Sequence, residues 1–140
     1  MIEPHLRSIA LALCLPSLFA CGALEGPSTP TREVQLSTAD ESLYWVEVER
    51  RISTWFRNGG VPAPTLLPAE TVYTKVHFLE VPHENLETCT FSKSTLDIRV
   101  GDDKWDGGCV PHELGHAVLW LLHNPCWDKF EHPNERPDQC

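Results

Sequence analysis

A helical period of apolar side chains runs through the first half of the chain. Thr38 is followed three residues later by Glu41, which is the pattern of a capping box. From there to Arg57 the apolar residues recur at near-helical spacing. These apolar residues are Leu43, Trp45, Val48, Ile52, Trp55 and Phe56. Because Asn58-Gly59-Gly60 offers residues that accept a positive φ, we predict a helix that ends there.

Two shorter segments are rich in β-branched and aromatic residues. Residues 71–79 follow a Pro-rich connection and have the composition of a strand, and residues 95–100 predict a second strand. The polar segment 82–94 between them is predicted to be a loop held by Cys89. With a further helix after the second strand, described next, the order of elements predicts an α+β fold.

That further helix carries the pentad His112-Glu113-Leu114-Gly115-His116. We predict that it begins near Cys109 and runs to about His123, where Asn124-Pro125 stops it. Pro111 is compatible with the first turn, where its missing N–H has no partner in the helix. Side chains four apart share one face of a helix, so His112 and His116 can both offer a ring nitrogen to one tetrahedral zinc ion.

The chemistry of the pentad comes from Glu113, which lies between the two histidines. Its carboxylate can hold the attacking water and take its proton, while zinc lowers the pKa of that water to about 7. The pentad therefore indicates metal-assisted hydrolysis with Glu113 as the catalytic base. The alternative is a surface helix that carries these residues by chance, and the strong apolar continuation 117–122 favours the site.

The N-terminal residues have the pattern of a secretory signal. Arg7 precedes an apolar run that ends at Ala20, too short for a transmembrane span, so residues 1–20 are predicted to be removed. The segment Leu18-Phe19-Ala20-Cys21 resembles the bacterial lipobox, which predicts a lipid on Cys21. Residues 21–36 would then be the lipidated cysteine and a flexible tether, and residues 37–140 one domain. Ordinary cleavage and free secretion is the alternative.

The cysteines and the net charge indicate the cellular compartment and exclude one class of partner. Four of the six cysteines remain outside the segment 1–21, an even number that suits disulfides and an oxidising compartment. Four cysteines allow three pairings, and the local one is preferred: Cys89 with Cys109, and Cys126 with Cys140. Zinc bound by cysteine is disfavoured, since no C-x-x-C pair is present. The formal net charge of −9 disfavours nucleic acid as a partner.

On the pentad, residues 38–140 resemble the zincin metallopeptidases in their small bacterial form. The resemblance implies a minimal zincin-like domain with an N-terminal helix, a small sheet and the pentad helix. It also implies a sheet strand beside the active-site cleft, for which residues 95–100 are the candidate. The metzincin subgroup is excluded, because Leu119 and Leu122 replace its glycine and histidine and the only methionine is Met1.

The third zinc ligand is expected further along the chain. His123 lies seven residues beyond His116, which places it about 10 Å along the helix axis and out of reach. His132 resembles the third histidine of small bacterial zincins, which lies in a loop and is followed by proline, as Pro133 follows here. We expect His132 to complete the site, and the alternatives are Glu131, Asp128 and His123. His77 and His83 are expected to be ordinary surface or half-buried residues.

Together these patterns predict a zinc metallopeptidase outside the cytoplasm, anchored to a bacterial membrane through Cys21. Zinc would be the cofactor, held by His112, His116 and His132, and the substrate would be a peptide or protein. We expect a monomer. A non-catalytic zinc-binding lipoprotein that acts as a binding module is the alternative function. A hydrolase of cell-wall amide bonds is a third possibility that sequence does not separate from a peptidase.

Overall fold

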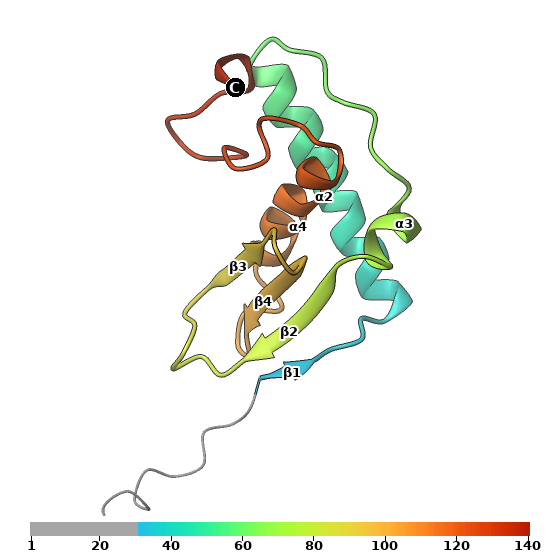
Figure 1. Ribbon diagram of the computed structural model, residues 1–140, viewed down its shortest axis with the longest axis vertical. Helices are drawn as coiled ribbons and strands as arrows, with labels where there is room; N and C mark the ends of the chain where they lie inside the picture. Colours follow the sequence, from blue (N-terminus) through green and yellow to red (C-terminus); the bar gives the residue numbers. More distant parts are fainter. Residues whose placement is uncertain (1–30) are drawn as a thin grey trace, which may run out of the picture.

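The computed structural model describes residues 31–140, which form an α+β fold with helices packed on one face of a small mixed sheet (Figure 1). The predicted signal and the lipid site at Cys21 lie outside the described residues. The elements are β1 (Arg32–Glu33), α2 (Thr38–Asn58), α3 (Ala69–Tyr73), β2 (His77–Val81), β3 (Cys89–Ser92), β4 (Asp97–Gly101), α4 (Cys109–Leu121) and the 3-10 helix η2 (Pro137–Gln139). Within residues 31–140 no helix is both long and apolar enough to cross a bilayer.

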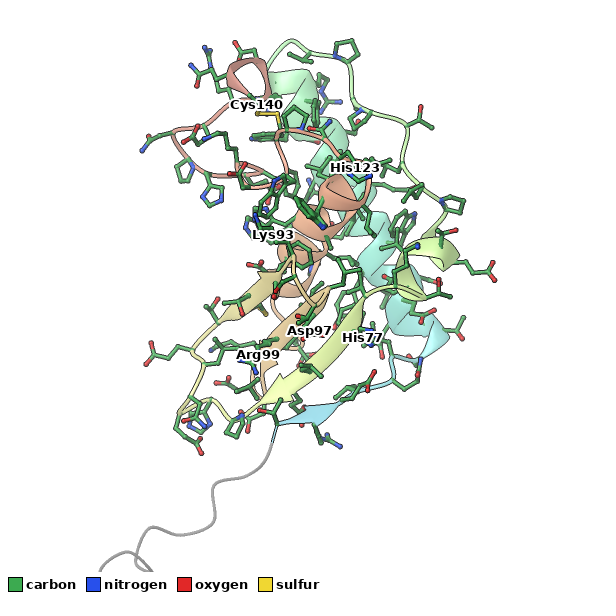
Figure 2. The ribbon with its side chains drawn as sticks, in the orientation of Figure 1. His77, Lys93, Asp97, Arg99, His123 and Cys140 are labelled. Atoms are coloured by element: carbon green, nitrogen blue, oxygen red, sulfur yellow. A yellow bond between two sulfur atoms is a disulfide. The ribbon has the colours of Figure 1, made fainter. Side chains whose placement is uncertain are left out.

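The sheet has the strand order β1-β2-β4-β3. β2 and β4 run parallel in its centre, with Phe78 opposite Ile98, and the outer strands β1 and β3 are antiparallel to their neighbours. Alternate side chains point to opposite faces, so Phe78, Ile98 and Val100 enter the core. Arg99 projects from the face that the helices leave open (Figure 2).

Helix α2 forms where the apolar period predicts it, and its cap differs by one residue. Ser37 is the N-cap, and its hydroxyl accepts the N–H of Asp40, so the cap is one residue earlier than the predicted Thr38. At the other end Gly60 has a φ of 71°, as its position after the helix requires. Val48, Ile52 and Phe56 form the buried face of α2 and pack against α4.

The prediction for residues 71–79 is wrong for its first half. Residues 69–73 form the short helix α3, and the strand β2 begins only at His77. Pro68 is the N-cap of α3, and Val72 is fully buried in the core. The packing of Val72 therefore overrides the strand propensity of Thr71 and Val72.

The prediction of a loop at 82–94 is also wrong in part, because it contains the strand β3. Thr90 and Phe91 of β3 pair with Arg99 and Ile98 of β4 in a hairpin, whose turn includes Leu96 with a φ of 57°. The predicted second strand is β4, shifted to Asp97–Gly101, and it is an inner strand. The edge strand near α4 is therefore β3, and residues 95–100 are not the edge that the sequence suggested.

The predicted disulfides are both present. Cys89 joins Cys109, which ties β3 to the first residue of α4, and Cys126 joins Cys140, which ties the segment after α4 to the chain end. These bonds suit an oxidising environment outside the cytoplasm. Residues 32–33, assigned to the tether from sequence, pair with β2 as β1.

Candidate metal centre

Helix α4 brings the three chemical groups of the pentad to one point. Nε2 of His112 lies 3.0 Å from Nε2 of His116, and ligand atoms of both histidines and of Glu113 lie within 4.8 Å of one another. His116 is buried, whereas His112 and Glu113 are half-buried and remain accessible. Within residues 31–140 this is the one group of at least three such side chains that could hold a metal ion.

The two imidazoles have the geometry that a tetrahedral ion requires. Two ligand nitrogens at about 2.0–2.1 Å from one zinc ion lie about 3.3 Å apart, close to the 3.0 Å between these Nε2 atoms. The Nδ1 atom of His116 donates to the carbonyl oxygen of Trp127. The Nδ1 atom of His112 lies 3.2 Å from Oε2 of Glu131. In neutral rings with these Nδ1 protons, both Nε2 atoms carry a lone pair at a separation of 3.0 Å, and a cation bound by both atoms relieves their repulsion.

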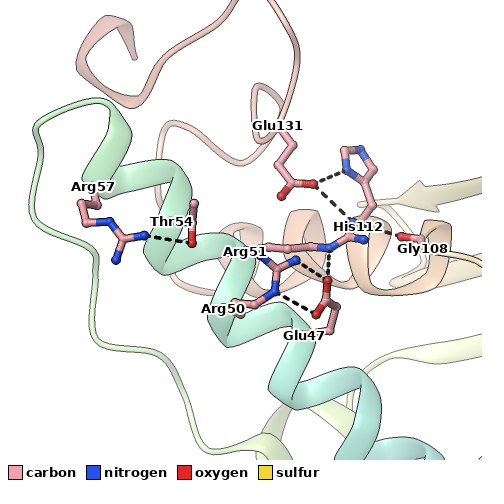
Figure 3. A network of polar contacts seen from close by, with 8 residues as sticks. All are labelled: Glu47, Arg50, Arg51, Thr54, Arg57, Gly108, His112 and Glu131. Atoms are coloured by element: carbon pink, nitrogen blue, oxygen red, sulfur yellow. Dashed lines mark hydrogen bonds and ion pairs between the residues drawn. The ribbon is translucent and has the colours of Figure 1, made fainter.

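Glu131 is in turn fixed by Arg51 of helix α2 (Figure 3). Nη1 of Arg51 lies 3.3 Å from Oε2 of Glu131 and donates to the carbonyl oxygen of Gly108 at 3.1 Å. Nε of the same side chain donates to Glu47 at 2.9 Å. One guanidinium thus connects α2, the residue before α4 and the loop after α4, and it orients the carboxylate that orients His112.

Phe130 holds the same loop against the pentad helix. Its ring stacks on His112 with 5.9 Å between ring centroids and is fully buried. A Cβ added at Gly115 would lie 2.2 Å from the Phe130 ring, so the glycine inside the pentad is what lets this ring approach. The loop that presents Glu131 and His132 is therefore positioned by the helix that carries the site.

Burial changes the acid–base behaviour of two groups at the site. Removal from water raises the pKa of the Glu113 carboxyl to about 7, and a hydrogen bond with the backbone of Phe91 partly opposes this rise. For His116 burial lowers the pKa, which favours the neutral ring that ligates metals, and the bond to Trp127 works in the opposite direction. A carboxyl with a pKa near neutrality is suited to accept and return a proton.

The candidates for a third ligand lie in different places. The His132 ring is exposed and packs beside the pentad, with centroids 5.6 Å from His116 and 6.2 Å from His112. It is not in the group whose ligand atoms lie within 4.8 Å of one another, so its role as a ligand stays a prediction. Glu131 accepts from His112, and Asp128 is exposed but close enough to raise the pKa of His116.

His123 lies at the far end of α4 (Figure 2), which ends two residues earlier than predicted. His123 has a φ of 54°, and its N–H donates to the carbonyl of Trp120 while that of Asn124 donates to Leu119. These two bonds are a Schellman motif, which closes the helix before His123. His77 and His83 are exposed and pair with acidic neighbours, as expected of surface residues.

Sequence reasoning missed the residues that orient the pentad. Arg51 lies 61 positions before His112 on another helix, and the interaction with Trp127 uses a backbone carbonyl, which every residue has. The sequence offers Glu131 only as an alternative ligand, whereas in the structure its carboxylate accepts a hydrogen bond from the ligand candidate His112.

Comparison of the chain with protein-family models, with curated proteins and with solved structures found no match. The residues of the site itself therefore supply the evidence for function.

Proposed function

We propose that this protein is a zinc-dependent peptide-bond hydrolase that works outside the cytoplasm. The observation that carries the proposal is the pair of converging Nε2 atoms, 3.0 Å apart, with Glu113 in the same cluster. A site with two imidazoles and an accessible carboxylate fits zinc, which favours nitrogen and oxygen ligands and keeps an open position for catalysis. We propose His132 as the third ligand, since its ring already packs against both imidazoles.

In this proposal each residue has one role. A zinc ion held by His112, His116 and His132 would supply Lewis acidity to a carbonyl oxygen and would make water a better nucleophile at neutral pH. Glu113 takes the proton of the attacking water and returns it to the leaving amine, for which its raised pKa is suited. Glu131 and the Trp127 carbonyl hold the two histidines in the tautomer that presents Nε2.

The location is part of the same proposal. A lipid on Cys21 would anchor the protein to a bacterial membrane, and the two disulfides support a place outside the cytoplasm. Free secretion after cleavage of residues 1–20 is the alternative outcome. Replacement of Cys21 by serine separates the two, because only the lipoprotein loses membrane attachment.

The test combines metal analysis with a hydrolysis assay. We expect about one zinc ion per chain, lost in His112→Ala and His116→Ala and retained in the control His83→Ala, whose ring is exposed away from the pentad. Glu113→Gln should keep the metal and lower hydrolysis of a peptide library by about a hundredfold or more, because the base is lost while the Lewis acid stays.

Two results would contradict the proposal. Unchanged zinc content in both histidine variants would exclude the site. Stoichiometric zinc with hydrolysis of neither peptides nor cell-wall amides, or with equal hydrolysis in Glu113→Gln, would exclude the catalytic role and favour a zinc-binding module without activity. Cleavage of cell-wall amides but not of peptides would change the substrate class while leaving the roles of the residues intact.

A further inference from the structure

A cavity lies at the N-terminal end of α2, apart from the pentad. It has a volume of about 750 Å³ and is lined by residues of β1, the first turns of α2, α3 and the start of β2. Figure 1 shows where these four elements lie in the fold. This size is in the range of sites for small molecules, about 300–1,000 Å³. The lining contains no residue of the pentad or of the loop after it, so the cavity is separate from the proposed zinc site.

Three aromatic residues, Trp45, Tyr73 and Phe78, line the cavity. The ring centroids of Trp45 and Tyr73 are 6.1 Å apart, and those of Tyr73 and Phe78 are 6.2 Å apart. The Tyr73 hydroxyl donates to the backbone carbonyl of Glu41 at 2.7 Å, which fixes the ring in place. Burial raises the pKa of Tyr73, and the neutral phenol adds no negative charge to the cavity that it lines.

The charged side chains that line the cavity are acidic. They are Glu33, Glu41 and Glu70, and the lining includes no Lys or Arg. His77 is the one basic lining residue, and its Nδ1 already lies 3.2 Å from Glu33. Within residues 31–140 the carboxylates of Glu41 and Glu70 form no ion pair, and their charge is therefore available to a ligand.

We propose that this cavity binds a small organic cation, an ammonium group on a compact apolar body. Aromatic faces attract cations through their quadrupole, and carboxylates at the same cavity add direct charge attraction. An anion would meet three carboxylates, and a neutral ligand would gain from the aromatic wall only. The proposal does not depend on the function of the pentad.

Isothermal titration calorimetry of the purified protein tests the charge requirement with matched probes. Choline and its neutral isostere 3,3-dimethylbutan-1-ol differ in a single central atom, and benzyltrimethylammonium offers a larger apolar body. We expect the two cations to bind about two- to thirtyfold more tightly than the neutral alcohol, which is the factor that the range of cation–π energies gives. Binding should be the same with and without added zinc.

Variants locate the binding. Glu41→Gln should lower the affinity for benzyltrimethylammonium by about three- to tenfold. The control is Glu49→Gln, the same change at an exposed position of α2 outside the cavity, and it should leave this affinity unchanged. Trp45→Leu should lower the affinity for benzyltrimethylammonium by about fivefold. Amide chemical shifts recorded by NMR during the titration should change around residues 41–46 and 69–78.

Several outcomes would overturn the proposal. Equal affinity for choline and the neutral alcohol would remove the charge requirement, as would an absence of binding at millimolar concentrations of every cation. Equal weakening in Glu41→Gln and Glu49→Gln would mean general attraction to an acidic protein. If a capped lysine peptide binds more than tenfold more tightly than benzyltrimethylammonium, the ligand of the cavity is a peptide and not a small organic cation.

Discussion

The two ends of helix α2 lie in different surroundings. Toward its C-terminal end Ile52 and Phe56 are buried against α4, and Arg51 bonds to the residue before α4 and to the loop after it. Toward its N-terminal end Leu43 is 69% exposed and Val46 is 64% exposed. The helix is regular throughout, and therefore the difference comes from what the rest of the chain places against each end.

The C-terminal end of α2 lies beside the pentad, whose side chains are held in place by neighbouring groups. The N-terminal end lies beside a cavity. At the pentad end, the polar groups are connected to one another, and a glycine allows an aromatic ring to lock the loop. At the other end the rings and carboxylates surround a cavity. We infer that the first end is built to hold a metal in a set geometry, whereas the second leaves room for a ligand.

The largest expected effect concerns the packing of α2. Ile52→Ala should lower the free energy of unfolding by about 2–5 kcal/mol, because Ile52 is 1% exposed and its loss leaves a cavity in the core. Leu43→Ala, at the open end of the same helix, should change it by no more than about 0.5 kcal/mol. Urea unfolding with the disulfides intact measures both. Similar losses in the two variants would show that the N-terminal end is covered in solution.

A second prediction tests how the pentad helix positions the loop. Gly115→Ala should lower the free energy of unfolding by about 1–3 kcal/mol, since its new Cβ would overlap the ring of Phe130. Zinc affinity should fall as well, because His132 and Glu131 follow that ring. In the control Gly107→Ala the nearest atom is at an ordinary 3.6 Å, and neither quantity should change much. Unaltered zinc affinity in Gly115→Ala would show that the position of the loop with Glu131 and His132 does not affect zinc binding.

The smallest expected effect concerns the carboxylate behind His112. Glu131→Gln should weaken zinc binding about tenfold with little change in stability, because the amide can still accept from Nδ1 but lacks the charge. Arg51→Gln should act in the same direction. The control is Glu135→Gln, which removes an equal charge from a carboxylate that pairs with Lys129 at 3.5 Å. Competition with a chelating dye measures the zinc affinities. Equal losses of zinc affinity in Glu131→Gln and Glu135→Gln would show that Glu131 contributes only through its negative charge and not by orienting His112.

The fold could be predicted where local pattern and packing agree. The long apolar period gave α2, the pentad with its apolar continuation gave α4, and the spacing of the cysteines favoured the two observed bonds. The short elements α3 and β3 could not be predicted from local pattern. Residues 69–73 became a helix because Val72 enters the core, and β3 formed because β4 offered it a partner in a hairpin. A few residues carry too little propensity to outweigh such contacts.

For the candidate site, the sequence by itself determined the pair of imidazoles and the carboxylate between them. Helix geometry alone places residues four apart on one face, so any helix that contains His112 and His116 brings their side chains within reach of one ion. The tertiary structure decided which groups orient those imidazoles: Arg51 through Glu131, and the carbonyl of Trp127. It also made the cavity at the other end of α2. Contacts between segments far apart in the chain depend on how the whole core packs, and that information is not local.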